Sequence, residues 1–450
     1  MQEKRSINFG FRGWMLVLYQ AIAFFTFLAF TNYPLNILAD MYGGAEKLSS
    51  LYTAAMVICI IIQLIIARFI GKLKNVKMFG IILGVISLAL AVGIMLIPPS
   101  QPALYQVVYF LEVLFVILWA TFTVGILVGQ WFPRRKGTVM GVATLAFPIG
   151  NGLIGVFAGN VFKTGAPTVA AAFVPFLIIG IIGLLIGVIF VKDYPEQCGA
   201  FRDNDKNMTP EAAKAMMEKE IQAKTNSVWT VGRTLKSREY WLLALPMGFL
   251  LMSAIGMMTQ TSTVLGAFAE QIAPFGGFGV VMPAIAILAC FGSWLLGVLD
   301  TKFGTKRAIL ISVIVMVIGG FIGSVHNVAC ILIALGCLAI YMGASSNFTV
   351  SGAAQYWRRE DFANVFAVVN PLANIMQAFG PMMVAFLLFS PVGFLFFASG
   401  YQSAFGAIGI IGIISLILIL LFKPSRVKET DDKYRQAAGL PLDDALEGRK

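Results

Sequence analysis

The chain has 450 residues, of which 58% are hydrophobic and only 12% are charged, and its formal net charge is +11. A soluble domain carries roughly 25% charged residues, so this composition excludes the soluble class. The cations gather in connections between apolar runs, so the positive charge is interpreted as a signal of membrane topology, and no nucleic-acid partner is expected.

Apolar runs long enough to cross a bilayer recur along the whole chain. A helix needs roughly 20 mostly apolar residues to cross the hydrocarbon core. Helices are preferred to a β-barrel because runs such as residues 178–191 lack the alternation of barrel strands. We therefore predict an all-α membrane protein with twelve transmembrane helices. The predicted spans are residues 12–38, 48–69, 78–97, 103–131, 138–162, 168–191, 240–268, 277–299, 307–325, 329–355, 363–389 and 399–422.

The distribution of cations predicts the orientation. Every lysine and arginine except Lys47 and Lys163 falls on one side of the predicted membrane. The positive-inside bias then places both termini in the cytoplasm, in a multi-pass protein of the cell membrane. The five cysteines show no paired spacing, so neither a disulfide nor a metal site is predicted.

The longest connection divides the spans into six and six. We predict an N-terminal bundle over residues 1–192, a cytoplasmic linker over 193–239, a C-terminal bundle over 240–422 and a cytoplasmic tail over 423–450. Thr209 followed by Pro210 is typical of a helix start, so a linker helix is expected as far as Lys224. The linker is interpreted as a tether, with a regulatory element as the alternative.

Landmark residues recur in the two halves at a nearly constant offset. Such an offset indicates duplicated, pseudo-symmetric six-helix bundles, and transporters built from repeats bind their substrate where the repeats meet. The pairs are Gly71 and Gly297 at 226 residues, Trp131 and Trp357 at 226, and Trp14 and Trp241 at 227.

One connection in each half carries a family resemblance. Residues 297–307, GVLDTKFGTKR, resemble the signature loop of the major facilitator superfamily, with one residue of difference in the spacing between the first Gly and the Asp. The equivalent loop at 71–77 has Asn75 where the family usually carries Asp. The stretches QWFPRRKG at 130–137 and KDYPE at 192–196 are similar to the oxalate/formate antiporter and monocarboxylate branch.

The resemblance implies that these loops act in a cytoplasmic gate. Glycines let helix ends approach closely, and nearby cations can reach helix C-terminal carbonyls or acids. The alternative is that the cations only enforce topology. The gate candidates are Gly71, Asn75, Gly297, Asp300, Gly304, Lys306 and Arg307.

Glu112 is the only one of the 22 acidic residues predicted well inside a span. An ionised carboxylate there is costly, so an intramembrane acid indicates a functional site. Its helical face also carries Tyr109 and Trp119. Because burial favours the neutral form of a carboxyl, Glu112 is the candidate for proton coupling. The alternative is a protonated glutamate that bonds a neighbouring helix.

Polar rows at the repeat offset predict the substrate cavity. Matching positions on the fifth and eleventh helices should face a common central cavity, although amides at this depth also join helices. The substrate-binding candidates are Tyr109, Trp119, Thr144, Asn151, Gln20, Gln260, Tyr341, Asn370, Asn374 and Gln377.

The predicted spans hold no cation at mid-membrane depth, which favours a neutral, zwitterionic or cationic solute. The family resemblance instead implies a monocarboxylate, which could bind protonated or through amides and helix N-termini. The chain also lacks the H-E-x-x-H, phosphate-loop and G-x-S-x-G motifs, so neither an enzyme nor a cofactor is predicted.

These observations predict a secondary active transporter that moves a small organic solute across the cytoplasmic membrane by alternating access. Proton symport through Glu112 is the leading hypothesis. One alternative is an oxalate/formate-like exchanger or uniporter in which Glu112 is structural. Another is a non-transporting membrane sensor that signals through the linker. A monomer in the lipid bilayer is expected, with no metal or cofactor.

Overall fold

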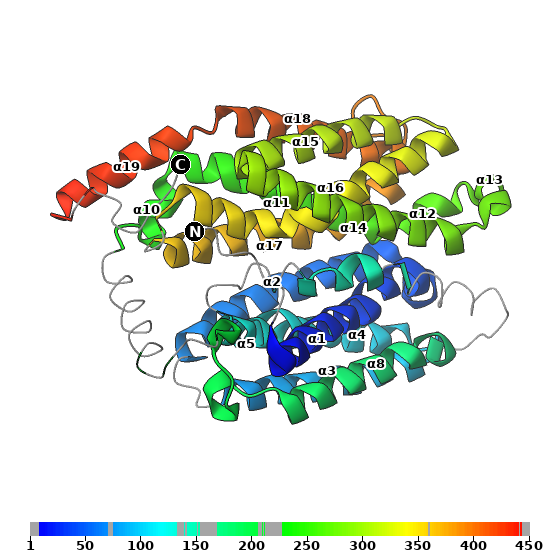
Figure 1. Cartoon of the computed structure of the whole chain (residues 1–450). Helices are drawn as coiled ribbons and strands as arrows, with labels where there is room; N and C mark the ends of the chain where they lie inside the picture. Colours follow the sequence, from blue (N-terminus) through cyan, green and yellow to red (C-terminus); the bar gives the residue numbers. More distant parts are fainter. Residues whose placement is uncertain are drawn as a thin grey trace.

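The computed structural model describes residues 9–70, 75–132, 139, 142–150, 152–153, 169–205, 209, 211, 227–358, 361–440 and 442. Within these residues all regular secondary structure is helical, which suits a bilayer because a helix satisfies its own backbone hydrogen bonds. The helices form two bundles that lie side by side along their length (Figure 1). The all-α prediction is confirmed.

The N-terminal half contains the first six of the predicted spans. Its first helix begins as an α-helix and continues in π-helical and 3-10 turns. Its fourth helix is interrupted by a π-helical segment. The elements are α1 (Gly10–Phe27), η1 (Leu28–Asn32), η2 (Pro34–Leu38), η3 (Ala39–Tyr42), α2 (Ala45–Ile70), α3 (Val76–Leu96), α4 (Pro102–Ile117), η4 (Leu118–Thr123), α5 (Val124–Trp131), α8 (Val169–Phe190), η5 (Pro195–Cys198) and η6 (Arg202–Asn204).

The C-terminal half is also built of long helices and includes a helix from the tail. The predicted span 240–268 is divided, because the helix ends at Met258 and a short helix follows the turn at Thr259 and Gln260. The elements are α10 (Val231–Lys236), α11 (Arg238–Met258), α12 (Thr261–Gly266), α13 (Ala269–Ile272), η7 (Ala273–Phe275), α14 (Phe278–Phe303), α15 (Thr305–Gly323), α16 (Val328–Tyr356), α17 (Phe362–Phe389), α18 (Tyr401–Leu421) and α19 (Pro424–Ala437).

Ten helices among the described residues are long and apolar enough to cross a membrane. An eleventh span results if the two parts of α16, Val328–Met342 and Asn347–Ala353, are counted together across their 43° bend. Most of the predicted span 138–162 lies outside the described residues. The described helices therefore agree with the predicted pattern of spans.

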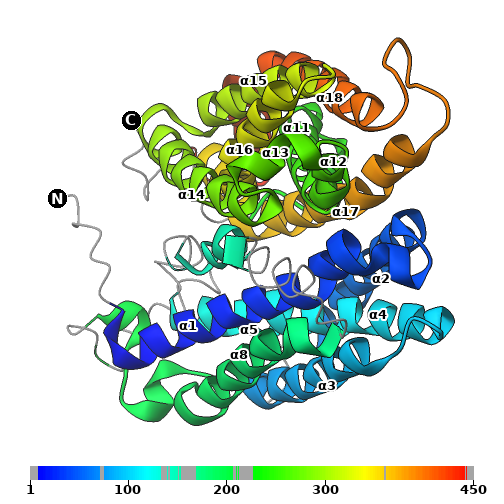
Figure 2. The ribbon, with the colours of Figure 1, turned by 90° about the vertical axis from the view of Figure 1, so that its right-hand side faces the viewer.

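The two halves meet through α2 and α17 (Figure 2). Ala378 of α17 is fully buried within the core of the N-terminal half. A second contact leaves no room at Gly152, where an added Cβ would lie 2.8 Å from the Cβ of Ala286 on α14. Helices of opposite halves thus approach as closely as helices within one bundle.

Candidate functional site

Glu112 lies on α4 and is fully buried, with 0% of its surface exposed. Ser87 on α3 donates a hydrogen bond from Oγ to Glu112 Oε1 at 2.9 Å. Glu112 Oε2 has no hydrogen-bond partner among the residues that the structure describes. An ionised carboxylate with so few partners would be strongly disfavoured. The geometry therefore suits a neutral carboxyl that faces α3 inside the N-terminal half.

The aromatic candidates on α4 and the segment that follows it join this helix to the first helix. Tyr109 donates from its hydroxyl to the carbonyl of Thr31 at 2.8 Å. Trp119 donates from Nε1 to the hydroxyl of Tyr19 at 2.7 Å. Both side chains are fully buried, and their polar atoms bond inside the N-terminal half.

Gln20 makes the third bond between these two helices. Its Nε2 donates to the carbonyl of Ala120 at 2.6 Å, and Ala120 belongs to the π-helical segment η4. Thr31, which accepts from Tyr109, belongs to the π-helical segment η1. Each helix thus supplies a side-chain donor to a backbone carbonyl in the π-helical segment of the other. Such segments are frequent at functional sites, but no residue pattern in the sequence indicated them.

The candidates of the C-terminal half form bonds between its own helices. The hydroxyl of Tyr341 on α16 lies 3.0 Å from Ser253 Oγ on α11. Thr349 Oγ1 donates to Asn370 Oδ1 at 3.4 Å, between α16 and α17. Asn374 and Gln377 are partly buried on α17. These contacts favour the helix-joining interpretation for Tyr341 and Asn370.

The fifth-helix candidates are only partly described. Thr144 is partly buried, and Asn151 lies outside the described residues. The predicted match between the polar rows of the fifth and eleventh helices therefore stays a prediction.

Gln260 takes part in the contact between the halves. Its Nε2 donates to Ser49 Oγ on α2 at 3.1 Å. Close to it, Thr53 Oγ1 donates to the carbonyl of Ala378 on α17 at 2.6 Å. Ser49 and Thr53 lie near the start of α2, at the end of the bundles opposite α10 and α19 (Figure 1). Both hydrogen bonds between the halves are uncharged. The positive-inside pattern predicts that this end of the bundles is extracellular.

The gate candidates that the structure describes bond within their own half. Asn75 Oδ1 accepts from the backbone N–H of Met78 at 2.9 Å and caps α3. Asp300 Oδ1 accepts from Thr305 Oγ1 at 2.6 Å, and Lys306 Nζ donates to the carbonyl of Phe422 at 2.7 Å, at the end of α18. These side chains satisfy helix ends. Their role in a gate stays a prediction.

The other gate candidates are glycines and an exposed cation. Gly304 joins α14 to α15 with φ +86, a conformation that favours glycine. Gly297 and Arg307 are exposed. Gly71 lies outside the described residues.

A second group of buried charges was not predicted. Asp361, Asp431 and Arg435 are at most 5% exposed, at the end of the C-terminal half where α10 and α19 lie. In the sequence, the charged stretches around these residues indicated only topology. The hydrogen bonds and ion pairs of the group join segments up to about 200 residues apart, and no local sequence pattern connects such segments.

Two helical bundles and a series of long apolar spans are typical of a polytopic membrane protein of the transporter class. The model of the Major Facilitator Superfamily matches residues 15–381 and 249–446, and the chain belongs to this family of membrane transporters, which are not enzymes. The superfamily resemblance is thereby confirmed. No curated protein matches the sequence.

Solved structures share the fold over nearly the whole chain. A bacterial homologue of the human lysosomal transporter Spinster, inward-facing and unoccupied, is similar with a TM-score of 0.61 and 14% identity over 95% of this chain and 99% of that one. Its occupied inward-facing form gives 0.60 and 14% over 94% and 98%. The nucleoside transporter NupG, in a mutant form, gives 0.62 and 10% over 90% and 99%. At these identities the likeness shows the fold alone.

Proposed function

We propose that this protein is a secondary active transporter that moves a small organic solute by alternating access and exchanges a proton at Glu112. The observation that carries the proton step is the complete burial of Glu112, whose one hydrogen-bond partner among the described residues is Ser87. Buried acids with few partners hold their proton until water or a charge reaches them. A change in access to Glu112 would therefore change its protonation.

The link from conformation to Glu112 runs through the first helix. Tyr109 and Trp119, one turn before and two turns after Glu112, are bonded to this helix. The first helix also donates the bond from Gln20 to η4. A shift of the first helix would thus move the segment of α4 that carries the acid. This is the route by which rocking of the halves would alter the surroundings of Glu112.

The charge inventory supports a neutral or cationic solute. Among the described residues of the membrane spans, Glu112 is the only buried ionisable acid apart from Glu239 at the very start of α11, and no lysine or arginine is buried there. A free anion would meet no fixed positive partner at mid-membrane depth in the described spans. The oxalate/formate-like alternative requires a monocarboxylate that binds protonated or is held by amides such as Gln260 and Asn370.

The test is uptake into proteoliposomes by the Glu112→Gln variant. A thermal-shift screen over neutral, cationic and carboxylate metabolites first identifies a solute that stabilises the protein. We expect Glu112→Gln to lose accumulation driven by a pH gradient and to keep solute counterflow. The control is Glu46→Gln, an exposed acid at the start of α2, which should accumulate solute like the wild type. Accumulation by Glu112→Gln under a pH gradient alone would exclude this coupling role.

Exchange or uniport with a structural Glu112 is the second candidate. The observation in its favour is that Glu112 faces α3 rather than the contact between the halves. In this case the wild type would show counterflow but no accumulation under a pH gradient, and Glu112→Gln would behave in the same way. Screen hits limited to monocarboxylates would support the oxalate/formate-like form of this candidate.

A further inference from the structure

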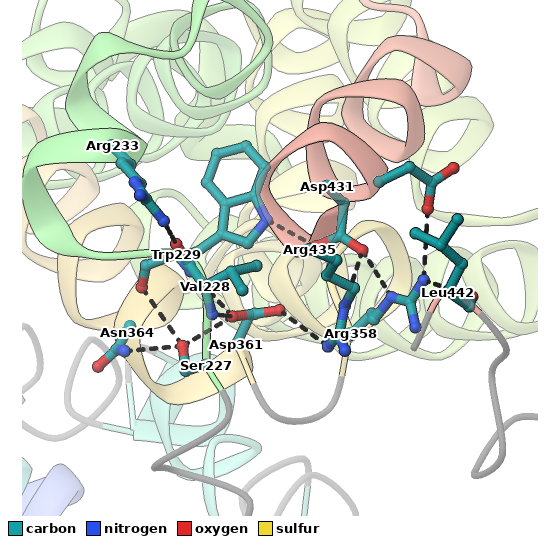
Figure 3. Close-up of polar contacts among 11 residues, drawn as sticks. Ser227, Val228, Trp229, Arg233, Arg358, Asp361, Asn364, Asp431, Arg435 and Leu442 are labelled. Carbon is teal, nitrogen blue, oxygen red and sulfur yellow. Dashed lines mark hydrogen bonds and ion pairs between the residues drawn. The ribbon is translucent and has the colours of Figure 1, made fainter. Parts of the chain in front are cut away.

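A buried polar cluster joins three distant parts of the chain in the C-terminal half (Figure 3). It combines the end of the predicted linker, the connection between α16 and α17, and the tail helix α19. We name it the linker–tail cluster. Its members are Ser227, Val228, Trp229, Arg358, Asp361, Asp431 and Arg435.

Asp361 holds the end of the linker. Its Oδ1 accepts three hydrogen bonds, from Ser227 Oγ at 2.7 Å and from the backbone N–H groups of Val228 at 2.8 Å and Trp229 at 3.0 Å. Burial raises the pKa of Asp361, while the bonds from Ser227, Trp229 and Val228 oppose that rise. Asn364 on α17 adds a bond from Nδ2 to Ser227 Oγ at 3.0 Å. The linker is therefore fixed to the start of α17.

The tail helix closes the cluster from the other side. Asp431 on α19 accepts from Trp229 Nε1 at 3.0 Å and pairs with Arg358 at 2.5 Å. Arg435, one turn further, pairs with Asp431 at 3.4 Å and with Asp361 at 3.9 Å. Asp431 and Arg435 thus connect the linker, the end of α16 and the tail. Figure 3 shows Asp361 and Arg358 facing these partners from the α16–α17 connection.

The other end of the predicted linker is docked on the N-terminal half. Trp131 Nε1 donates to the carbonyl of Lys192 at 2.8 Å, and Asp193 Oδ1 accepts from the backbone N–H of Lys77 at 2.8 Å. Asn204 packs so closely on Gly10 that an added Cβ there would lie 2.8 Å from Asn204 Oδ1. Both flanks of the connection are therefore packed, each on its own half.

We propose that the linker–tail cluster is a permanent anchor that holds the linker on the C-terminal half while the ends of the bundles open and close. The linker is then fixed to the C-terminal half from Ser227 onward, and α19 is a structural part of that half. Opening the cluster would break the buried hydrogen bonds and ion pairs of Asp361, Asp431 and Arg435 together, which costs more than opening exposed contacts. An element opened in every cycle would instead be expected to rely on weaker, exposed contacts.

Hydrogen exchange at the amides of Val228 and Trp229 tests the anchor directly. Both amides bond Asp361, so they should exchange slowly in the wild type, and about tenfold or more faster in Asp361→Ala. Asp431→Asn, which removes a charge without changing the side-chain shape, should also speed their exchange. Glu429→Gln is the matched control, because Glu429 is exposed on the same helix. Unchanged exchange in Asp361→Ala or Asp431→Asn would overturn the role given to that residue.

A disulfide tests whether the anchor stays closed. In a background without the five native cysteines, Ser227→Cys and Asn364→Cys place thiols where the two side chains now bond. Exchange at residues 45–53, at the opposite end of the bundles, should be equal in the oxidised and reduced forms of this variant. Slower exchange there in the oxidised form would show that the cluster must open, and would refute a permanent anchor. Neither measurement involves transport, so failure here is distinct from failure of the proposed function.

Discussion

Two tyrosines one turn apart on α4 illustrate how the contribution of a buried hydroxyl to stability depends on its hydrogen-bond partner. Tyr109 donates to the carbonyl of Thr31. The hydroxyl of Tyr105 is buried and has no hydrogen-bond partner among the described residues, and its ring stacks on Tyr42 with the centroids 3.6 Å apart. A lost hydrogen bond with a buried partner is more costly than the loss of a hydroxyl without one.

The first prediction is that Tyr109→Phe lowers stability more than Tyr105→Phe. Removal of the Tyr109 hydroxyl leaves the carbonyl of Thr31 without this donor in a π-helical segment, at a cost of about 1–2 kcal/mol. Tyr105→Phe should be neutral or slightly stabilising, because it removes a buried polar group without a partner. Thermal unfolding of the two variants in the same detergent checks this. A larger drop in Tm for Tyr105→Phe would contradict the assignment of the two hydroxyls.

At the scale of helices, small residues decide how closely α11 and α17 pack. A Cβ on Gly380 would lie 2.2 Å from the carbonyl oxygen of Met252, and one on Gly256 would lie 2.5 Å from the carbonyl oxygen of Gly380. Both obstacles are backbone atoms, which cannot move aside like a side chain. Close helix contacts in membranes commonly depend on such small residues.

The second prediction compares two Gly→Ala substitutions. Gly380→Ala should lower stability by about 1–3 kcal/mol or more, because the added methyl group forces the two helices apart. Gly297→Ala should be neutral or stabilise by about 0.5–1 kcal/mol, since Gly297 lies in α14, and a Cβ there would have no neighbour within 4 Å. Folded yield and Tm measure both effects. If Gly297→Ala slows transport while stability is unchanged, the gate role predicted for Gly297 gains support.

At the scale of the whole molecule, the described hydrogen bonds between the halves are uncharged. Gln260 bonds Ser49, and Thr53 bonds the carbonyl of Ala378. Uncharged bonds of this kind contribute about 1 kcal/mol each. Hydrogen bonds of this strength add little to the free-energy difference between two conformations, which suits the alternating access that we propose.

The third prediction concerns the balance between these states. Ser49→Ala removes the acceptor of Gln260, so the population in which this end of the bundles is open should rise about fivefold, the factor for 1 kcal/mol. Spin labels at the exposed positions Lys47 and Glu270 would report this as a larger long-distance fraction. Ser50→Ala is the control, because the hydroxyl of Ser50 bonds the carbonyl of Glu46 in its own helix. An equal shift in both variants would argue against a role for the Ser49 bond.

The sequence predicted some features of the site and missed others. The burial of Glu112 and of the aromatic residues on its face was predictable, because an apolar span with one acid leaves few alternatives. Its neighbour Ser87 was not predictable, since the partner depends on how α3 and α4 are rotated against each other. The linker–tail cluster was missed for the same reason, as Ser227 and Asp361 are 134 residues apart in the chain.

Local chemistry by itself determined the helical class, the order of the apolar spans and the superfamily, while the duplication of the halves stays a prediction. Hydropathy, length and repeat spacing are properties of consecutive residues, so they can be read before any contact is known. Only the tertiary structure decided that Glu112 faces α3, that Gln260 joins the halves, and that the tail and the linker share one cluster. Those facts depend on helix rotation and on the packing of distant segments, which sequence spacing does not specify.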